Sequence, residues 1–134
     1  MDDQRRYLCR GGVSHDLGRA IAKMSDRIVS NNELQKALDY LRDSAEDMGR
    51  AKSRAVRAGH MMKHIEALAF KASDATSNDK RQADARTSEA YVFAIDEDAI
   101  AAGELEKLKA YREAAALKIE AWRSEQANYR SMKI

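Results

Sequence analysis

The stretch SNNELQKALDYLRDSAEDMGRAKSRAVRAGHMMKHIEALAFKA, residues 30–72, decides the fold because it joins a helix start signal to a long apolar repeat. Ser30 and Glu33 have the S-x-x-E form of a capping box, in which each side chain satisfies a backbone amide of the other residue. The apolar residues that follow recur every three or four positions, which keeps one helix face buried. They are Leu38, Leu41, Ala45, Met48, Ala51, Ala55, Ala58, Met62, Ile65, Ala69 and Ala72. This pattern predicts one continuous helix from residue 34 to residue 72.

Such a helix would be roughly 60 Å long at about 1.5 Å per residue, so it needs an equally long partner. The segment 73–79, SDATSND, is rich in residues that favour turns and helix caps, which predicts that the chain reverses there. A second helical region from Lys80 to Ser131 then supplies the partner, with a break near Gly103 because glycine disfavours a helix interior. Its downstream half has a heptad-like seam of Leu105, Leu108, Ala115, Ile119, Trp122 and Tyr129, interrupted by Arg112 and Gln126.

The predicted fold is therefore all-α, a long antiparallel helical hairpin that resembles a coiled coil. Residues 33–134 form this hairpin domain, and residues 1–32 form an N-terminal arm with a short helix from Ser14 to Val29. The apolar face of that short helix comprises Leu17, Ile21, Met24 and Ile28. Met24 could also serve as a translation start.

Composition agrees with a single helical domain. The chain has 134 residues and no proline, and its 24 Lys and Arg against 22 Asp and Glu leave a net charge of +2, which argues against a histone-like tail. The longest apolar run, Ala90 to Ile95, is far shorter than the roughly 18 residues of a membrane span. The N-terminus lacks the apolar segment of a secretory signal, and the single Cys9 fits a reducing cytosol.

The last helix carries a second apolar strip that a two-helix hairpin does not need. This strip comprises Ala110, Ala114, Leu117 and Ala121. A third helix or a second subunit should cover it, so we expect a dimer or another homo-oligomer.

Basic residues gather on one side of the first long helix. They are Arg50, Lys52, Arg54, Arg57, Lys63, His64 and Lys71. Residues 50–72 contain six Lys and Arg but only one acid, Glu66, so groups of opposite sign should compensate them. One alternative is internal pairing with the purely acidic segment 88–106, which a turn near residue 76 would bring alongside. The other is a phosphate-binding face, where Tyr91 and Phe93 could stack on bases or else belong to the core.

No motif points to catalysis. His60 and His64 lie one helical turn apart, a spacing that suits two metal ligands, but Met61 stands where an HExxH motif needs glutamate, and no third ligand is apparent. Asp96, Glu97 and Asp98 are consecutive and cannot converge on a metal from a regular helix. Nucleotide-binding and hydrolase signatures are also missing. We therefore expect a non-enzymatic protein without a cofactor or metal, and keep a metal enzyme using the two histidines as a third alternative.

Two segments carry a family resemblance: LDYLRDSA, residues 38–45, and REAAALKIEAWRSEQANYR, residues 112–130. Together with the basic stretch between them, they resemble small helical proteins of tailed phages and prophages, often encoded near DNA recombination and replication genes. The resemblance covers residues 34–131, leaves residues 1–23 outside, and supplies no catalytic residues. It implies an accessory protein in the host bacterial cytoplasm that binds a protein partner, DNA or both. The alternative is an anti-defence protein that binds and inhibits a host defence complex.

Overall fold

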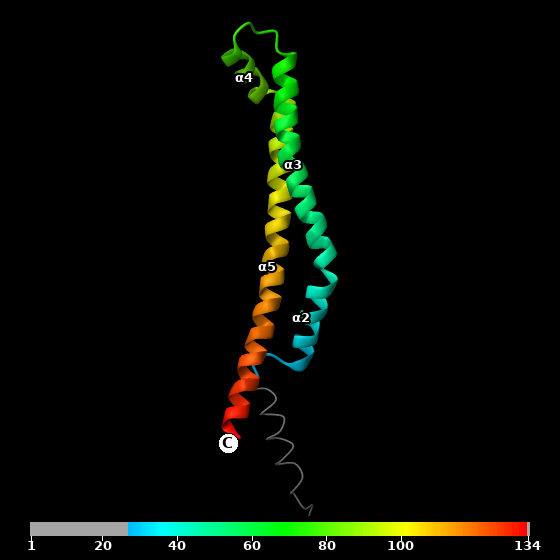
Figure 1. The fold of residues 1–134 in the computed structure, drawn as a ribbon, viewed down its shortest axis with the longest axis vertical. Helices are drawn as coiled ribbons and strands as arrows, with labels where there is room; N and C mark the ends of the chain where they lie inside the picture. Colours follow the sequence, from blue (N-terminus) through cyan, green and yellow to red (C-terminus); the bar gives the residue numbers. More distant parts are fainter. Residues whose placement is uncertain (1–26, 134) are drawn as a thin grey trace, which may run out of the picture.

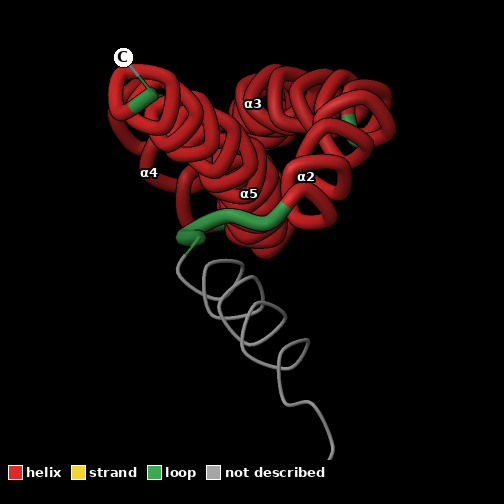
Figure 2. The backbone as a smooth tube through the Cα atoms, turned by 90° about the horizontal axis from the view of Figure 1, so that it is seen from below, coloured by secondary structure: helices red, strands yellow, loops and turns green. Residues whose placement is uncertain are grey.

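The computed structural model describes residues 27–133, which form four helices and no strand. They are α2 (Asn31–Asp43), α3 (Ala45–Ala72), α4 (Asn78–Thr87) and α5 (Glu89–Met132). Helices α2 and α3 follow one another along one side of the molecule, and α5 runs the opposite way along both (Figure 1). Seen from the end, α5 lies beside both helices in an elongated hairpin (Figure 2). The prediction of an all-α chain is confirmed.

The capping box at the start of α2 is present as predicted. The Ser30 hydroxyl accepts a hydrogen bond from the Glu33 N–H at 3.1 Å, and the Ser30 N–H donates to Glu33 Oε2 at 2.9 Å. The bond from the Ser30 N–H, and secondly the Ser30 side chain, lowers the pKa of Glu33 below its ordinary value. The start of the hairpin is therefore fixed locally by two neighbouring polar residues.

The predicted short helix over residues 14–29 lies outside the described residues except at its end. There, residues 28 and 29 form a bend, and Ser30 has an extended backbone with ψ at 160° because it caps α2. The structure therefore corrects the C-terminal end of this predicted helix. Cys9 and Met24 lie outside the described residues.

Two regular heptad repeats form the seam between α2 and α3 on one side and α5 on the other. The first comprises Leu34, Ala37, Leu41, Ser44, Met48, Ala51, Ala55, Ala58, Met62, Ile65 and Ala69, all buried or half-buried. The second comprises Tyr91, Ala94, Asp98, Ala101, Leu105, Leu108, Arg112, Ala115, Ile119, Trp122 and Gln126, which are likewise buried or half-buried. Spacings of three and four alternate without exception, as in a coiled coil. Tyr129, predicted to lie in the seam, is instead 41% exposed near its end.

Three of the predicted apolar positions differ from the structure. The sequence pattern assigned Leu38, Ala45 and Ala72 to the buried face, but Leu38 is 44% exposed, and Ala45 and Ala72, the latter at the end of α3, are also exposed. Ala37 and Ser44 take the first two of these places, each 5% exposed. At Leu38 and Ala45 the pattern failed because it followed residue polarity, whereas the heptad spacing places a serine inside.

The predicted continuous helix from 34 to 72 is wrong at one residue. α2 ends at Asp43 and α3 begins at Ala45, with Ser44 between them. Here Arg112 of α5 donates to the Leu41 carbonyl at 2.9 Å and to Ser44 Oγ at 2.7 Å. A basic side chain that binds a carbonyl in the last turn acts as a helix C-cap. Arg112 thus caps α2 from the other side of the hairpin.

The chain reverses at residues 73–77, inside the predicted turn 73–79, and α4 then folds back against α3 and α5. The expected break near Gly103 is wrong, because Gly103 lies inside the continuous α5. The break instead falls at Ser88, whose extended backbone and hydroxyl cap α5 by accepting from the Tyr91 N–H at 3.3 Å. The cost of about 1 kcal/mol for a helical glycine does not outweigh the packing of a helix this long.

Candidate nucleic-acid interface

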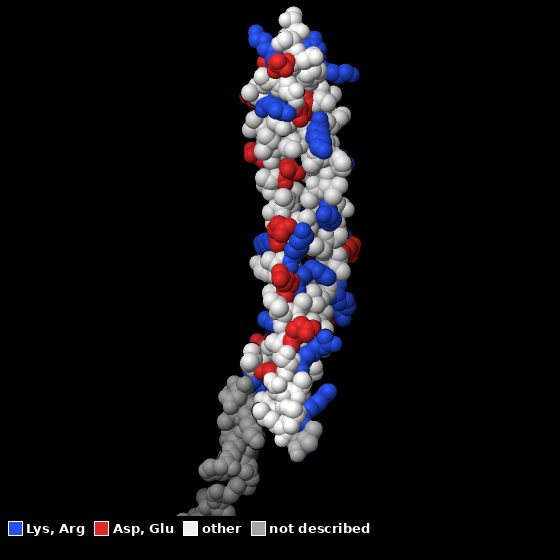
Figure 3. All heavy atoms as spheres, turned by 60° about the vertical axis from the view of Figure 1, so that its left-hand side comes forward, with Lys and Arg blue, Asp and Glu red and all other residues white. Residues whose placement is uncertain are grey.

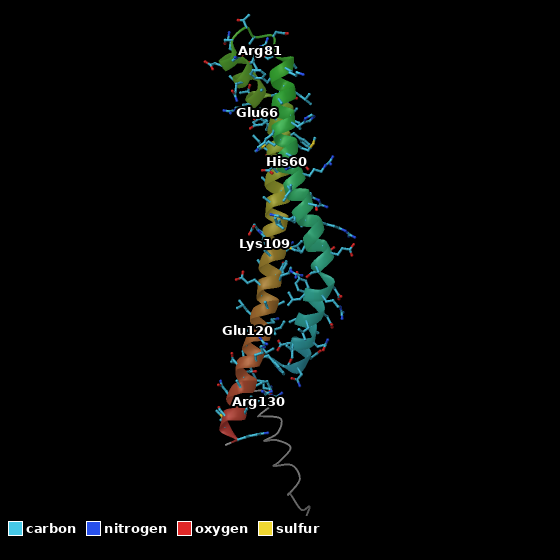
Figure 4. All side chains as sticks on the ribbon, viewed as in Figure 1. His60, Glu66, Arg81, Lys109, Glu120 and Arg130 are labelled. Atoms are coloured by element: carbon cyan, nitrogen blue, oxygen red, sulfur yellow. The ribbon has the colours of Figure 1, made fainter. Side chains whose placement is uncertain are left out.

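The candidate site lies on the outer face of α3, which we define by Arg50, Arg57, Lys63, His64 and Lys71. Four of these residues, Arg50, Arg57, His64 and Lys71, are spaced seven apart and therefore form one line along the helix. All five are exposed. This line lies outside the seam by which α3 faces α5, and Arg57 borders the groove between the two helices. In Figure 4, His60 marks the middle of α3, and Glu66 and Arg81 mark the end that holds α4.

The predicted basic residues differ in how far acids neutralise them. Arg50 binds Glu46 at 2.5 Å within α3, and Arg54 binds Glu104 of α5 at 2.7 Å. Among residues 27–133, no ion pair involves the other predicted Lys and Arg residues. These are Lys52, Arg57, Lys63 and Lys71.

In the described residues, ion pairing between α3 and α5 is thus confined to one pair, Arg54–Glu104. The predicted turn would have placed Arg54 opposite residue 98. Asp98 lies instead beside Gly59, with Oδ1 3.6 Å from the position of a Cβ on that glycine. The register differs because α4 occupies part of the segment that was expected to pair with α3. Glu89 and Asp96 of the acidic segment are exposed.

The one acid in residues 50–72 is held by α4 and does not neutralise the outer face of α3. Glu66 accepts hydrogen bonds from Arg86 at 3.0 Å and from Gln82 at 3.2 Å. The bond to Arg86, followed by the bond to Gln82, lowers the pKa of the Glu66 carboxyl. The outer face of α3 therefore carries basic side chains and no acid from Arg57 to Lys71. Figure 3, which brings the α5 side toward the viewer, shows many basic side chains along one edge and acidic ones mainly elsewhere.

A shallow depression lies beside this basic line. It has a volume of about 590 Å³ and is lined by Lys52, Ser53, Val56, Arg57, His60, Met61 and His64. Val56 and Met61 give it an apolar floor and are 47% and 39% exposed. Neither residue was among the predicted site residues. Val56 lies four residues from both Lys52 and His60, so that spacing could have placed it on the basic side.

The two aromatic residues near the start of α5 have different surroundings. Tyr91 is half-buried in the seam, as the core alternative predicted. Phe93 is 64% exposed and lines a groove of about 410 Å³ between α3 and α5, together with Arg54 and Arg57. An exposed aromatic ring beside arginine side chains can stack on a nucleic-acid base.

The histidine pair lies on α3, where His60 and His64 are both exposed. Within residues 27–133, no three His, Cys, Asp or Glu side chains lie close enough together to hold a metal ion. In the same part of the chain, no helix has the length and apolar character of a membrane span.

No protein-family model, curated protein or solved structure matches this chain. The resemblance to phage proteins therefore stays a prediction from the two sequence segments that carry it.

Proposed function

We propose that this protein is a non-enzymatic binding protein that contacts the DNA backbone through the outer face of α3. In the setting that the sequence resemblance implies, it is an accessory protein of phage DNA recombination or replication. One observation carries the proposal: Arg57, Lys63 and Lys71 are exposed on one side of a helix and form no ion pair among the described residues.

The chemistry of such a face suits phosphate. Lysine and arginine neutralise DNA phosphates and release condensed counterions, which supplies most of the sequence-independent affinity. Residues seven apart on a helix are about 10 Å apart along its axis, so the outer face of α3 can reach several phosphates in succession. Phe93, at the edge of the neighbouring groove, adds a surface on which an unpaired base can stack.

Fluorescence anisotropy with a labelled DNA duplex at 50–200 mM salt tests the proposal, a range over which phosphate contacts weaken by orders of magnitude. The test variant combines Arg57→Ala, Lys63→Ala and Lys71→Ala. We expect it to reduce the slope of log K against log salt by about 2.7, which corresponds to three lost phosphate contacts. Circular dichroism should show unchanged or slightly increased helix content, because alanine is a strong helix former.

The matched control combines Arg42→Ala, Lys109→Ala and Arg123→Ala, and it removes the same formal charge. Each of these basic residues already binds an acid on its own helix, at 2.9, 2.8 and 3.1 Å respectively. We expect a smaller change in slope from the control than from the test variant. Equal changes would mean that net charge alone drives binding and would contradict the assigned face.

The anti-defence alternative has a different signature in the same assay. If the wild-type protein binds no duplex DNA yet captures one host protein in a salt-insensitive manner, the DNA proposal is wrong and the alternative replaces it. Pull-down from infected cells followed by mass spectrometry would identify that host protein.

A further inference from the structure

Outside the seam, α5 carries a second apolar line, whose members Phe93 and Ala114 border the grooves that α5 forms with α3 and with α2. Phe93, Ile100 and Leu117 are 64%, 58% and 63% exposed. Phe93, Ile100, Ala114 and Ala121 are separated by multiples of seven, so they form one line along the helix. We call these five residues the outer line of α5. α5 thus has one apolar line in the hairpin core and another that is exposed at four positions and half-buried at Ala121.

Charge is unequally distributed along the same helix. Residues 89–106 contain six acids and no Lys or Arg. Residues 107–133 contain seven Lys and Arg against three acids. The boundary between the acidic and basic segments falls at Lys107, which also lies midway between Phe93 and Ala121 on the outer line. The outer line of α5 and the boundary between its acidic and basic segments are therefore both centred on Lys107.

We infer that the outer line of α5 is the interface with a second copy of this chain, packed antiparallel about a twofold axis near Lys107. An antiparallel arrangement places the acidic segment 89–106 of each copy beside the basic segment 107–133 of the other. A parallel arrangement would place acid on acid and base on base. An interface that matches itself in this way is what a twofold dimer requires.

Side-chain sizes agree with the same axis. Twofold symmetry about Lys107 sets Phe93 opposite Ala121 of the second copy, and Ile100 opposite Ala114. Each large side chain thus faces a small one, which allows the two helices to pack without gaps. Next to the axis, a Cβ on Gly103 would meet nothing within 4 Å, so the surface there is open to a neighbouring helix.

This inference goes beyond the proposed function and does not depend on DNA binding. Phe93 of the outer line of α5 borders the same groove as Arg57 of the outer face of α3, so a dimer formed through α5 buries Phe93 and removes its surface for a base. The rest of the outer face, including Lys63 and Lys71, is presented twice. Two DNA-contacting faces on one particle would strengthen binding through effective concentration if both can engage one duplex.

Disulfide crosslinking of the full chain tests the axis directly. Cys9 is the only cysteine, so the background variant is Cys9→Ser. In that background we expect Lys107→Cys to form a covalent dimer under mild oxidation, because the two copies of residue 107 meet at the axis. Glu89→Cys is the matched control, since its two copies would be about 54 Å apart along an antiparallel pair.

Crosslinking of both cysteine variants would indicate a parallel pair and overturn the inference, as would crosslinking of neither. Sedimentation equilibrium at tens of micromolar protein supplies a second measurement, for which we expect a dimer. Ile100→Lys should yield a monomer, because it brings a lysine to the basic segment of the second copy. Leu38→Lys, on an exposed position of α2, should remain dimeric. A monomeric wild-type protein would contradict the inference while leaving the DNA proposal open to its own test.

Discussion

The two halves of the hairpin differ in the size of their seam side chains. The upper half, where α3 packs on residues 91–105, has a seam dominated by alanine, including the buried Ala51, Ala94 and Ala101. The lower half, where α2 packs on residues 108–126, contains larger side chains. They include Leu34, Leu41, Leu108, Ile119 and Trp122. α3 lies close to α5 near α4, whereas α2 diverges from it (Figure 1), because the residues at a helix contact set the distance between the axes.

The lower half also has more polar contacts between its helices than the upper half. In the lower half, Arg112 binds the junction at Ser44, and Trp122 Nε1 donates to Asn31 Oδ1 at 3.1 Å. In the upper half, one exposed ion pair, Arg54–Glu104, crosses between α3 and α5 among the described residues. Directional bonds thus fix the register of the lower half, and alanine packing holds the upper half.

The largest expected effect is the loss of Trp122, the bulkiest side chain in the lower seam. Trp122→Ala should lower the free energy of unfolding by about 3 kcal/mol, the low end for truncating a large aromatic, since this tryptophan is only half-buried. Urea denaturation measures the change. Tyr129→Ala, at an exposed position, should cost clearly less. A loss below about 1 kcal/mol would mean that large side chains do not hold the lower half together.

Replacing Arg112 tests the polar contribution to the lower half. Arg112→Met keeps the aliphatic stem but leaves the Leu41 carbonyl and Ser44 Oγ without their donor, which should cost about 2 kcal/mol in urea denaturation. Arg123→Met, which removes an exposed pair within α5, should change stability by less than about 0.5 kcal/mol. Equal effects of the two changes would show that the junction bonds do not fix the register.

The upper half should respond to an added side chain more than to a removed one. Ala101→Leu inserts three carbons into a seam position that is only 4% exposed, so overpacking should cost about 1.5 kcal/mol. The matched control Ala102→Leu adds the same group at an exposed position and should be nearly neutral. Thermal melts compare the two variants. A neutral Ala101→Leu would mean that alanine does not set the helix spacing there.

The smallest expected effect is at the start of α2. Ser30→Ala removes the cap and should cost about 1 kcal/mol at neutral pH. The lowered pKa of Glu33 means that its contribution is complete above the ordinary value of 4.5 and is lost as the pH falls through the lowered pKa. The stability difference between wild type and variant should therefore shrink as the pH falls below 4.5. A difference that does not depend on pH would contradict the reciprocal cap.

Much of the fold could be predicted from local signals in the sequence. The S-x-x-E cap at Ser30, the turn at 73–77 and most seam residues follow from residue types and spacing within one segment. Ser44 could not be predicted as a helix junction, because its cap comes from Arg112, 68 residues away. Ser88 is a residue type that caps helices, but glycine disfavours a helix interior, so the sequence predicts the break at Gly103 instead.

Less of the candidate site could be predicted. Spacing alone placed the seven basic residues on one helix, but it did not show that Arg50 and Arg54 bind acids while Arg57 and Lys63 do not. For Arg54 that distinction depends on the register between α3 and α5, which the insertion of α4 changes, whereas Arg50 binds Glu46 four residues earlier on its own helix. The exposure of Phe93 is likewise a consequence of register, because an aromatic residue in an apolar run is more often buried.

Amide hydrogen exchange of the protein with and without a DNA duplex tests the central claim most directly, because it shows which helix the DNA contacts. We expect DNA to slow exchange in α3 between residues 50 and 71, at the outer face of α3, and to leave residues 107–132 of α5 nearly unchanged. The basic segment of α5 is the natural control, since it carries a similar number of Lys and Arg residues. Protection confined to that segment, or no protection in the presence of DNA, would contradict the account.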